Sequence, residues 1–108
     1  GRQIPLFGNG RSRRDYTHVS DIVSALVKSL SWKGGFEIVN LGGARTITLM
    51  ELVHAIEKSV GRKAVLKRMP NQKGDVPLTS ADIRKARRLL GWTPKMSLDK
   101  GLTEYARA

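Results

Sequence analysis

The sequence predicts an α/β fold whose elements follow one another in the order β-α-β-α-β-α-α. Short runs of apolar and β-branched residues at 4–7, 36–41 and 64–69 are typical of strands. Apolar residues between and after these runs recur at helical spacing. Ser, Thr and Gly residues stand where those helices are expected to begin and end.

The first half of the chain contains two of the predicted strands. In the strand 4–7, Pro5 suits a sheet edge or the start of a strand. Asn9-Gly10 is a strong signal for a tight turn, and a basic loop over 11–15 follows it. Residues 36–41 are mostly apolar, stop at two glycines, and predict a buried strand. Between the two strands we expect a helix over 19–31, with one apolar face made of Val19, Ile22, Val23, Leu26 and Leu30.

The clearest helix of the sequence lies between residues 48 and 61. Thr48 is a good N-cap, and Glu51 stands three residues later, where it completes a capping box. Gly61 is a typical C-terminal cap. A third strand over 64–69 follows and is closed by a proline.

Two further helices are expected near the end of the chain. Thr79 or Ser80 can cap the first of them, which carries Ile83, Ala86 and Leu90 and ends at Gly91. Trp92 is interpreted as a core or interdomain packing residue. Ser97 can cap the final helix, whose inward face is expected to consist of Leu98, Leu102 and Tyr105.

The composition is that of one ordinary globular domain. The 108 residues are 40% hydrophobic and 27% charged. The sequence has no cysteine, which fits a reducing compartment, and a cytoplasmic location is therefore expected. No apolar run reaches the roughly 18 residues that a membrane span needs. The start of the sequence has no apolar signal-peptide region, and the chain is expected to begin inside a larger fold.

The charge is strongly positive. Twenty Lys and Arg residues oppose nine Asp and Glu residues, which gives a formal net charge of +11. Such a balance attracts anions, and the candidates are nucleic acid, anionic lipid or a phosphorylated ligand. Aromatic residues make up only 6% and no nucleic-acid-binding module is visible, so sequence-specific nucleic-acid binding is not expected.

The sequence contains no catalytic, cofactor-binding or metal-ligating constellation. His18 and His54 are the only histidines, and neither has the neighbours of a catalytic triad or the spacing of a metal site. Gly8 and Gly10 begin a dinucleotide fingerprint, but Arg13 occupies the position of its third glycine. In the basic loop, Arg14 can bind a phosphate as a planar fork, or it can form a structural pair with the neighbouring Asp.

Several segments together resemble the extended short-chain dehydrogenase/reductase family of NAD-dependent sugar epimerases and dehydratases. Phe-Gly-x-Gly at 7–10 is followed by Arg-Asp-Tyr-Thr-x-Val-x-Asp-Ile-Val at 14–23. Asn-Leu-Gly at 40–42 and Gly-Asp-Val-Pro-Leu-Thr-Ser-Ala-Asp at 74–82 continue in the family's order. The resemblance implies that residues 1–108 form the C-terminal, substrate-binding part of a Rossmann-type fold. The NAD-binding part and the catalytic Tyr-x-x-x-Lys pair have no counterpart here, so the chain alone is expected to be inactive.

The resemblance also implies substrate contacts for five positions. Arg14 matches an Arg that contacts the nucleotide diphosphate, and Asp75 matches an Asp that accepts hydrogen bonds from ribose hydroxyls. Pro5 and Phe7 belong to the strand beside the uracil. Gln72 stands where UDP-galactose epimerases usually have an Arg. A Gln at this place resembles the UDP-glucuronate epimerase branch of the family.

The functional expectation is therefore a UDP-sugar-binding portion of an NAD-dependent isomerase similar to UDP-glucuronate 4-epimerase. A dehydratase or a decarboxylase is the alternative within the family, and a basic nucleic-acid-binding protein is the alternative outside it. The parent enzyme is expected to be a homodimer. We expect the 36–41 strand to belong to the dinucleotide domain's sheet, which predicts an exposed apolar surface and self-association of the isolated chain.

Overall fold

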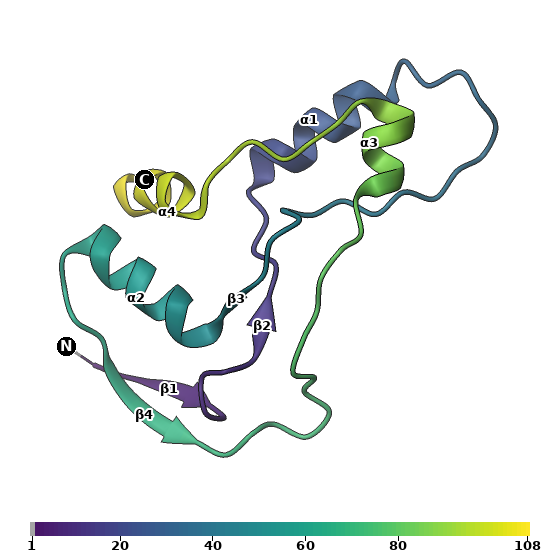
Figure 1. Cartoon of the computed structure of the whole chain (residues 1–108). Coiled ribbons are helices and arrows are strands. Elements are labelled where there is room, and N and C mark those ends of the chain that lie inside the picture. The colour runs from purple at the N-terminus through teal and green to yellow at the C-terminus, as the bar shows by residue number, and fades with distance from the viewer. Residues whose placement is uncertain (1) are drawn as a thin grey trace.

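A computed structural model of the chain describes residues 2–108. Gly1, the first residue of the region predicted over 1–108, lies outside the described residues. Helices and strands are mixed along the chain, which confirms the α/β class (Figure 1). The elements are β1 (Gln3–Phe7), β2 (Arg13–Arg14), α1 (Val19–Ser29), β3 (Ile47–Thr48), α2 (Leu49–Val60), β4 (Val65–Met69), α3 (Arg84–Leu90) and α4 (Leu98–Arg107).

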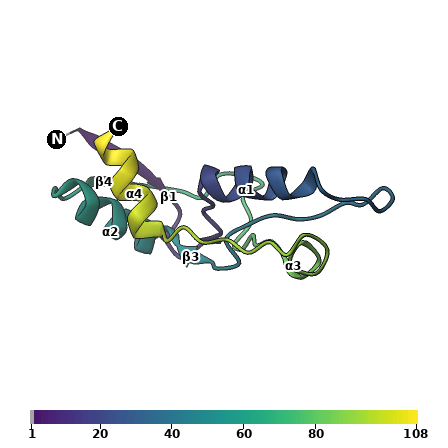
Figure 2. The same cartoon turned by 90° about the horizontal axis from the view of Figure 1, so that it is seen from above.

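The molecule is an elongated plate rather than a closed globule. Its principal extents are 51 × 34 × 16 Å. Its radius of gyration is 16.6 Å, whereas a compact domain of this length has about 13 Å. Strands β1 and β4 lie with helices α2 and α4 at one end, and helices α1 and α3 lie at the other end (Figures 1 and 2).

Strands β1 and β4 form a two-stranded parallel sheet. The register pairs Gln3 with Val65 and Phe7 with Met69. Because parallel strands cannot be joined by a tight turn, the connection between them is long and contains β2, α1, β3 and α2. The strands predicted over 4–7 and 64–69 are thereby confirmed.

A second, very short sheet pairs β2 with β3 in antiparallel orientation. Its two-residue strands are too short to show any periodicity, so the sequence reveals neither of them. Arg13 also donates its backbone N–H to the Pro77 carbonyl at 2.8 Å and accepts from the Thr79 N–H at 3.1 Å. The observed order β-β-α-β-α-β-α-α therefore differs from the predicted one.

The predicted strand over 36–41 is absent among residues 2–108, which is a correction to the expected fold. The segment is a loop at the α1–α3 end of the molecule (Figures 1 and 2). Phe36 is 91% exposed and Ile38 is 71% exposed, whereas Val39 and Leu41 pack against the core. A strand needs a hydrogen-bonded neighbour, and the described residues supply none beside this segment.

The exposed apolar surface expected from the sequence is present. Besides Phe36 and Ile38, it includes three residues of the α1 face and the C-cap residue, which are between 51% and 85% exposed, namely Val19, Val23, Leu26 and Leu30. Within residues 2–108, other parts of the chain cover helix α1 mainly around Ala25. The self-association inferred from such a surface stays a prediction.

Helix α2 matches its prediction closely. The Thr48 hydroxyl accepts from the Glu51 N–H at 3.1 Å, and the Glu51 carboxylate accepts from the Thr48 N–H at 3.2 Å. Gly61 ends the helix with a φ of 71°, a left-handed conformation that glycine adopts without strain. Helix α1 is confirmed as well, but it ends at Ser29 rather than at residue 31.

Helix α3 begins later than predicted. Its N-cap position is occupied by Ile83, not by Thr79 or Ser80, and the Asp82 carboxylate accepts from the Arg84 N–H at 3.0 Å. Thr79 belongs instead to an extended segment beside β2, in which its N–H donates to the Arg13 carbonyl and Leu78 forms a bridge with Arg13.

Helix α4 begins as predicted but differs on its inward face. The Ser97 side chain accepts from the Lys100 N–H, as expected of the cap. Tyr105, expected to face inward, is 82% exposed, because the described residues cover little of the last turn of α4.

The buried core lies between α1 and α3. It consists of Ala25, Ile83, Ala86 and Trp92, and Trp92 has no exposed surface. The Trp92 indole N–H donates to the Asp21 carbonyl at 3.0 Å and to the Ser24 hydroxyl at 2.9 Å. The packing role predicted for Trp92 is confirmed, and its polar atom is satisfied in the interior.

Candidate functional site

A groove of about 570 Å³ lies along the β1–β4 sheet and the apolar face of α2. The five residues to which the sequence assigns substrate contacts all line it, although they come from separate segments. They are Pro5, Phe7, Arg14, Gln72 and Asp75. The fold therefore brings the predicted residues together, and their binding roles stay predictions.

Arg14 and Asp75 are in direct contact at the polar end of this groove. The Arg14 Nη2 donates to the Asp75 Oδ1 at 2.6 Å and to the Val76 carbonyl at 2.7 Å. The Arg14 Nη1 donates to the Arg13 carbonyl at 2.7 Å. The two side chains are 24% and 38% exposed, so the ion pair remains accessible from solvent. The alternative pairing of Arg14 with the adjacent Asp15 is wrong.

A turn presents Asp75 and Gln72 to the groove. The Asp75 N–H donates to the Gln72 carbonyl at 3.1 Å. Gly74 lies between them with a φ of 85°, a conformation that residues with a side chain rarely adopt. The turn is exposed, so the contacts of Asp75 with Arg14 are important for its position.

Strand β1 contributes Pro5 and Phe7 to the wall of the groove. Phe7 is 37% exposed, so its ring remains available for stacking or packing. The chain turns directly after Phe7, where the Gly8 N–H donates to the Met69 carbonyl at 2.8 Å. Gly8 adopts a φ of 80°, and a side chain at this position would meet that of Asn71, so a glycine suits this turn.

Asp15 has a structural role that the sequence does not reveal. Its carboxylate accepts from the Gly43 N–H at 2.9 Å and from the Ala44 N–H at 3.1 Å. Ala44 adopts a φ of 61°, and Gly43 has no room for a side chain because Asp15 fills the space. Asp15 thereby ties the loop after residue 41 to the segment that carries Arg14. Its adjacency to Arg14 is the only signal in the sequence, and it suggests the wrong partner.

The opposite end of the groove is basic. Arg2, Arg62 and Lys63 line it together with Glu57. The Glu57 carboxylate accepts from the Ala64 N–H at 2.7 Å and contacts the His54 Nδ1 at 3.0 Å. The Ala64 hydrogen bond, followed by that of His54, lowers the pKa of Glu57 below its ordinary value. Glu57 is therefore a carboxylate at neutral pH.

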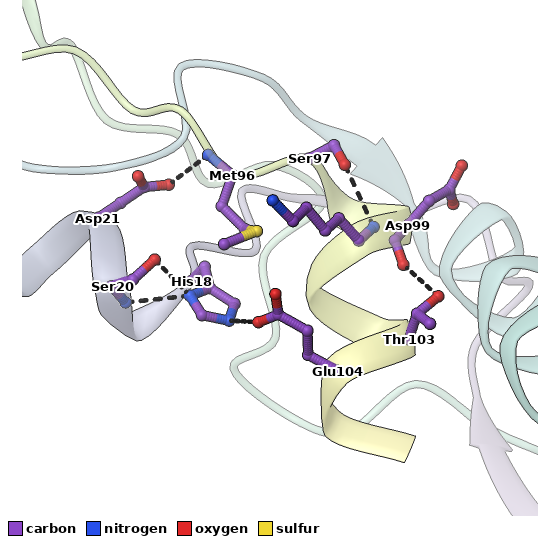
Figure 3. A network of polar contacts seen from close by, with 9 residues as sticks. His18, Ser20, Asp21, Met96, Ser97, Asp99, Thr103 and Glu104 are labelled. Carbon is purple, nitrogen blue, oxygen red and sulfur yellow. Dashed lines mark hydrogen bonds and ion pairs between the residues drawn. The ribbon is translucent and has the colours of Figure 1, made fainter. Parts of the chain in front are cut away.

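His18 joins α1 to α4 in a polar network (Figure 3). Its Nδ1 accepts from the Ser20 N–H at 3.0 Å and therefore caps α1, while its Nε2 lies 3.7 Å from the Glu104 carboxylate. The cap requires an unprotonated Nδ1, so the ring proton is on Nε2, facing Glu104. The arrangement is structural. Within residues 2–108, no group of three or more His, Cys, Asp or Glu residues could hold a metal ion.

The turn at Gly8 and Gly10 does not have the form of a dinucleotide cradle. Such a cradle needs a glycine-rich turn that leads from a strand into the N-terminus of a helix. Gly8 and Gly10 follow strand β1, but the chain continues into β2, not into a helix. The two glycines therefore form a structural turn, as the interruption of the fingerprint by Arg13 indicates.

Comparisons with known proteins identify the family. The sequence model of the family described as GDP-mannose 4,6 dehydratase matches residues 1–105. The chain belongs to this family. Its relatives include UDP-glucuronate 4-epimerases and other NAD-dependent epimerases and dehydratases of nucleotide sugars, as the motifs predict.

Two relatives illustrate the range of activities. The chain is 38% identical to the UDP-glucuronate 4-epimerase of Thermodesulfobacterium geofontis, over 94% of this chain and 31% of that enzyme. It is 34% identical to UDP-glucuronic acid decarboxylase 2 of Arabidopsis thaliana, over 92% of this chain and 22% of that enzyme. The chain thus spans about a third or less of the length of these relatives.

The fold is equally similar to that of solved enzymes. The UDP-glucuronic acid 4-epimerase of Bacillus cereus, solved with UDP-glucuronic acid and NAD, superposes with a TM-score of 0.88 at 30% identity. The superposition covers 98% of this chain and 35% of that one. Among residues 2–108, no helix has the length and apolar character needed to cross a membrane.

Proposed function

We propose that this chain is the nucleotide-sugar-binding portion of an NAD-dependent epimerase, with a UDP-sugar of the UDP-glucuronate type as its ligand. The observation that carries the proposal is the convergence of all five predicted contact residues on one groove. These residues are up to 70 positions apart in the sequence (Pro5 to Asp75), and the fold alone brings them together. The similarity to UDP-glucuronate epimerases supports the choice of ligand.

The chemistry of the groove fits the parts of such a ligand. The Asp75 carboxylate can accept two hydrogen bonds from ribose hydroxyls. Arg14 supplies a permanent positive charge on the side where the diphosphate is expected. Phe7 and Pro5 form an apolar wall for the base. The carboxylate of a glucuronate adds a further negative charge, which a chain of net charge +11 attracts.

The catalytic chemistry is proposed to reside outside this chain. The solved relatives hold NAD, and the glycine turn of residues 8–10 does not fit that cofactor. We therefore assign NAD to an additional, dinucleotide-binding part and derive no hydride step for the residues described. The exposed 36–41 segment is proposed to join the sheet of that part, and residues 1–108 alone are expected to be inactive.

Decarboxylase and dehydratase activities are the alternatives within the family. The Arabidopsis relative favours the first, because it is a UDP-glucuronic acid decarboxylase that matches nearly the whole chain. All of these enzymes act on nucleotide sugars, so the proposal for the groove is the same. A basic nucleic-acid-binding protein is the alternative from another class, and the charge of +11 is the observation that favours it.

Calorimetric titration of UDP-glucuronate and UDP into the chain tests the proposal. We expect saturable binding that Asp75→Ala weakens about tenfold or more, because hydrogen bonds to a charged group are lost. Arg11→Ala is the matched control, since the Arg11 side chain makes no hydrogen bond or ion pair within residues 2–108. Absence of binding refutes the proposed site. Equal loss in both variants, together with a steep dependence on salt, refutes it in favour of nonspecific polyanion binding.

A further inference from the structure

Strand β2 places Arg14 between two side chains that point the other way. Successive side chains of an extended segment lie on opposite faces. Arg14 faces the groove, which it lines together with Asp75. Arg13 and Asp15 contact the segment 43–46 instead, and neither of them is among the residues that line the groove. The two sequence neighbours of Arg14 therefore anchor the strand from its other face.

The guanidinium of Arg13 binds the residue that precedes β3. Its Nε donates to the Thr46 hydroxyl at 3.1 Å, and its Nη2 donates to the Thr46 carbonyl at 2.9 Å. Its Nη1 lies 3.8 Å from the Glu51 carboxylate in the first turn of α2. An exposed ion pair at such a distance contributes little. The two bonds with Thr46 are therefore the main contacts of this side chain.

The backbone of Arg13 connects this anchor to the loop that carries Asp75. Its N–H donates to the Pro77 carbonyl at 2.8 Å, and its carbonyl accepts from the Thr79 N–H at 3.1 Å. Residues 71–80 are all exposed, so packing contributes little to holding them. The β2–β3 sheet pairs two residues of each strand, and so short a pairing is marginal by itself. A side-chain contact that strengthens it therefore acts on Arg14 and on the Asp75 loop together.

We propose that Arg13 is a positioning residue for the groove. Its side chain fastens β2 to Thr46, and β2 in turn holds the Arg14 guanidinium and the Asp75 carboxylate where the ligand is to meet them. Arg13 acts through these two residues and does not itself touch the ligand. This inference rests on the proposed function of the groove, and it leaves the diphosphate contact to Arg14, as the family resemblance implies.

Amide hydrogen exchange without ligand compares two matched variants, Arg13→Gln and Arg13→Met. Both remove the charge, and their side chains have similar lengths. The Gln Nε2 takes the place of the Arg Nε and can donate to the Thr46 hydroxyl, whereas Met has no donor. We expect the Thr79 amide to exchange about fivefold faster in Arg13→Met than in Arg13→Gln, the order of effect that one net hydrogen bond supplies. Equal exchange at Thr79 in the two variants overturns the inference, whether or not the chain binds a nucleotide.

Helix α3 provides an internal control in the same experiment. It lies at the end of the molecule away from the β1–β4 sheet (Figures 1 and 2). A general loss of stability would accelerate exchange in α3 and at Thr79 alike, because both would exchange through global unfolding. We expect the α3 amides to exchange at the same rate in Arg13→Gln and Arg13→Met. An equal acceleration at Thr79 and throughout α3 gives Arg13 a merely structural role and overturns the inference.

Titration with UDP extends the comparison to the ligand. The two variants have the same net charge, so a difference between their affinities does not come from lost attraction to the diphosphate. We expect Arg13→Met to bind UDP about fivefold more weakly than Arg13→Gln. Thr46→Val should remove most of this difference, because the hydroxyl that accepts from position 13 is lost.

Two results of the titration overturn the inference, namely equal affinities of the two variants and a difference that Thr46→Val leaves intact. If the unaltered chain does not bind UDP, the proposed function of the groove fails. The exchange at Thr79 and in α3 then still decides whether Arg13 holds β2 and the Asp75 loop in place.

Discussion

Asp21 joins distant segments of the chain through a single buried carboxylate. It is 5% exposed and accepts from the Lys95 N–H at 2.9 Å and from the Met96 N–H at 3.2 Å. Its backbone carbonyl accepts from the Trp92 indole. The segment between the core tryptophan and α4 is therefore fixed by one residue of α1 (Figure 3). The sequence indicates only a favourable acidic residue in the first turn of that helix.

Asp21→Asn is expected to destabilise the chain by about 1–3 kcal/mol, because one backbone N–H loses its acceptor in a nearly buried site. Urea unfolding at low protein concentration measures the loss. Asp99→Asn is the control, since Asp99 is an exposed acidic residue in the first turn of α4 and should cost at most about 1 kcal/mol. Equal losses in both variants would contradict the role assigned to Asp21.

Helix α2 shows how an element's ends couple it to its surroundings. Its N-terminus carries the capping box, in which the Thr48 N–H lowers the pKa of Glu51. Near its C-terminus, Glu57 accepts from the Ala64 N–H at the entrance to β4. The second contact joins α2 to the sheet across the groove, and the sequence gives no sign of it because it depends on the path of the chain after Gly61.

The Glu57 contact predicts a dependence of stability on pH. Its pKa in the folded chain is lowered from the ordinary value of 4.5. The stabilisation is therefore fully present above the unfolded pKa and is lost as the pH falls through the folded value. Unfolding measured between neutral and acidic pH should show a difference between the unaltered chain and Glu57→Gln that shrinks as the pH decreases. A difference that is constant with pH would contradict this assignment.

The whole molecule is flat, and its apolar surface is only partly covered. Within residues 2–108, only five hydrophobic residues are buried, whereas Phe36, Ile38 and the outer face of α1 are exposed. We propose that, in the parent enzyme, this surface contacts the dinucleotide-binding part. As an isolated chain it has no such cover, and exposed apolar area of this kind favours association.

Sedimentation velocity is expected to show self-association of the chain that increases with concentration. Replacing both Phe36 and Ile38 by Ser should reduce it, because these side chains are 91% and 71% exposed. Tyr105→Ser is the control, since Tyr105 is 82% exposed but belongs to α4 at the other end of the molecule (Figure 2). A chain that stays monomeric, or two variants with equal effects, would count against this surface as the cause.

Local patterns determined most of the elements and one functional hypothesis. Periodicity, caps and glycines predicted α1, α2, α4, β1 and β4 because these signals act over a few residues. The segments of the family resemblance selected the five candidate contact residues, and the structure places all of them on one groove. These inferences need no knowledge of how distant parts of the chain meet.

Only the tertiary structure decided the pairing of side chains and strands. Arg14 pairs with Asp75, 61 positions away, and not with its neighbour Asp15. The 36–41 segment has every local feature of a strand, but it lacks a hydrogen-bonding neighbour among the described residues. Strand formation and ion pairing both require a second group brought close in space, and that proximity is a property of the folded chain and not of the local sequence.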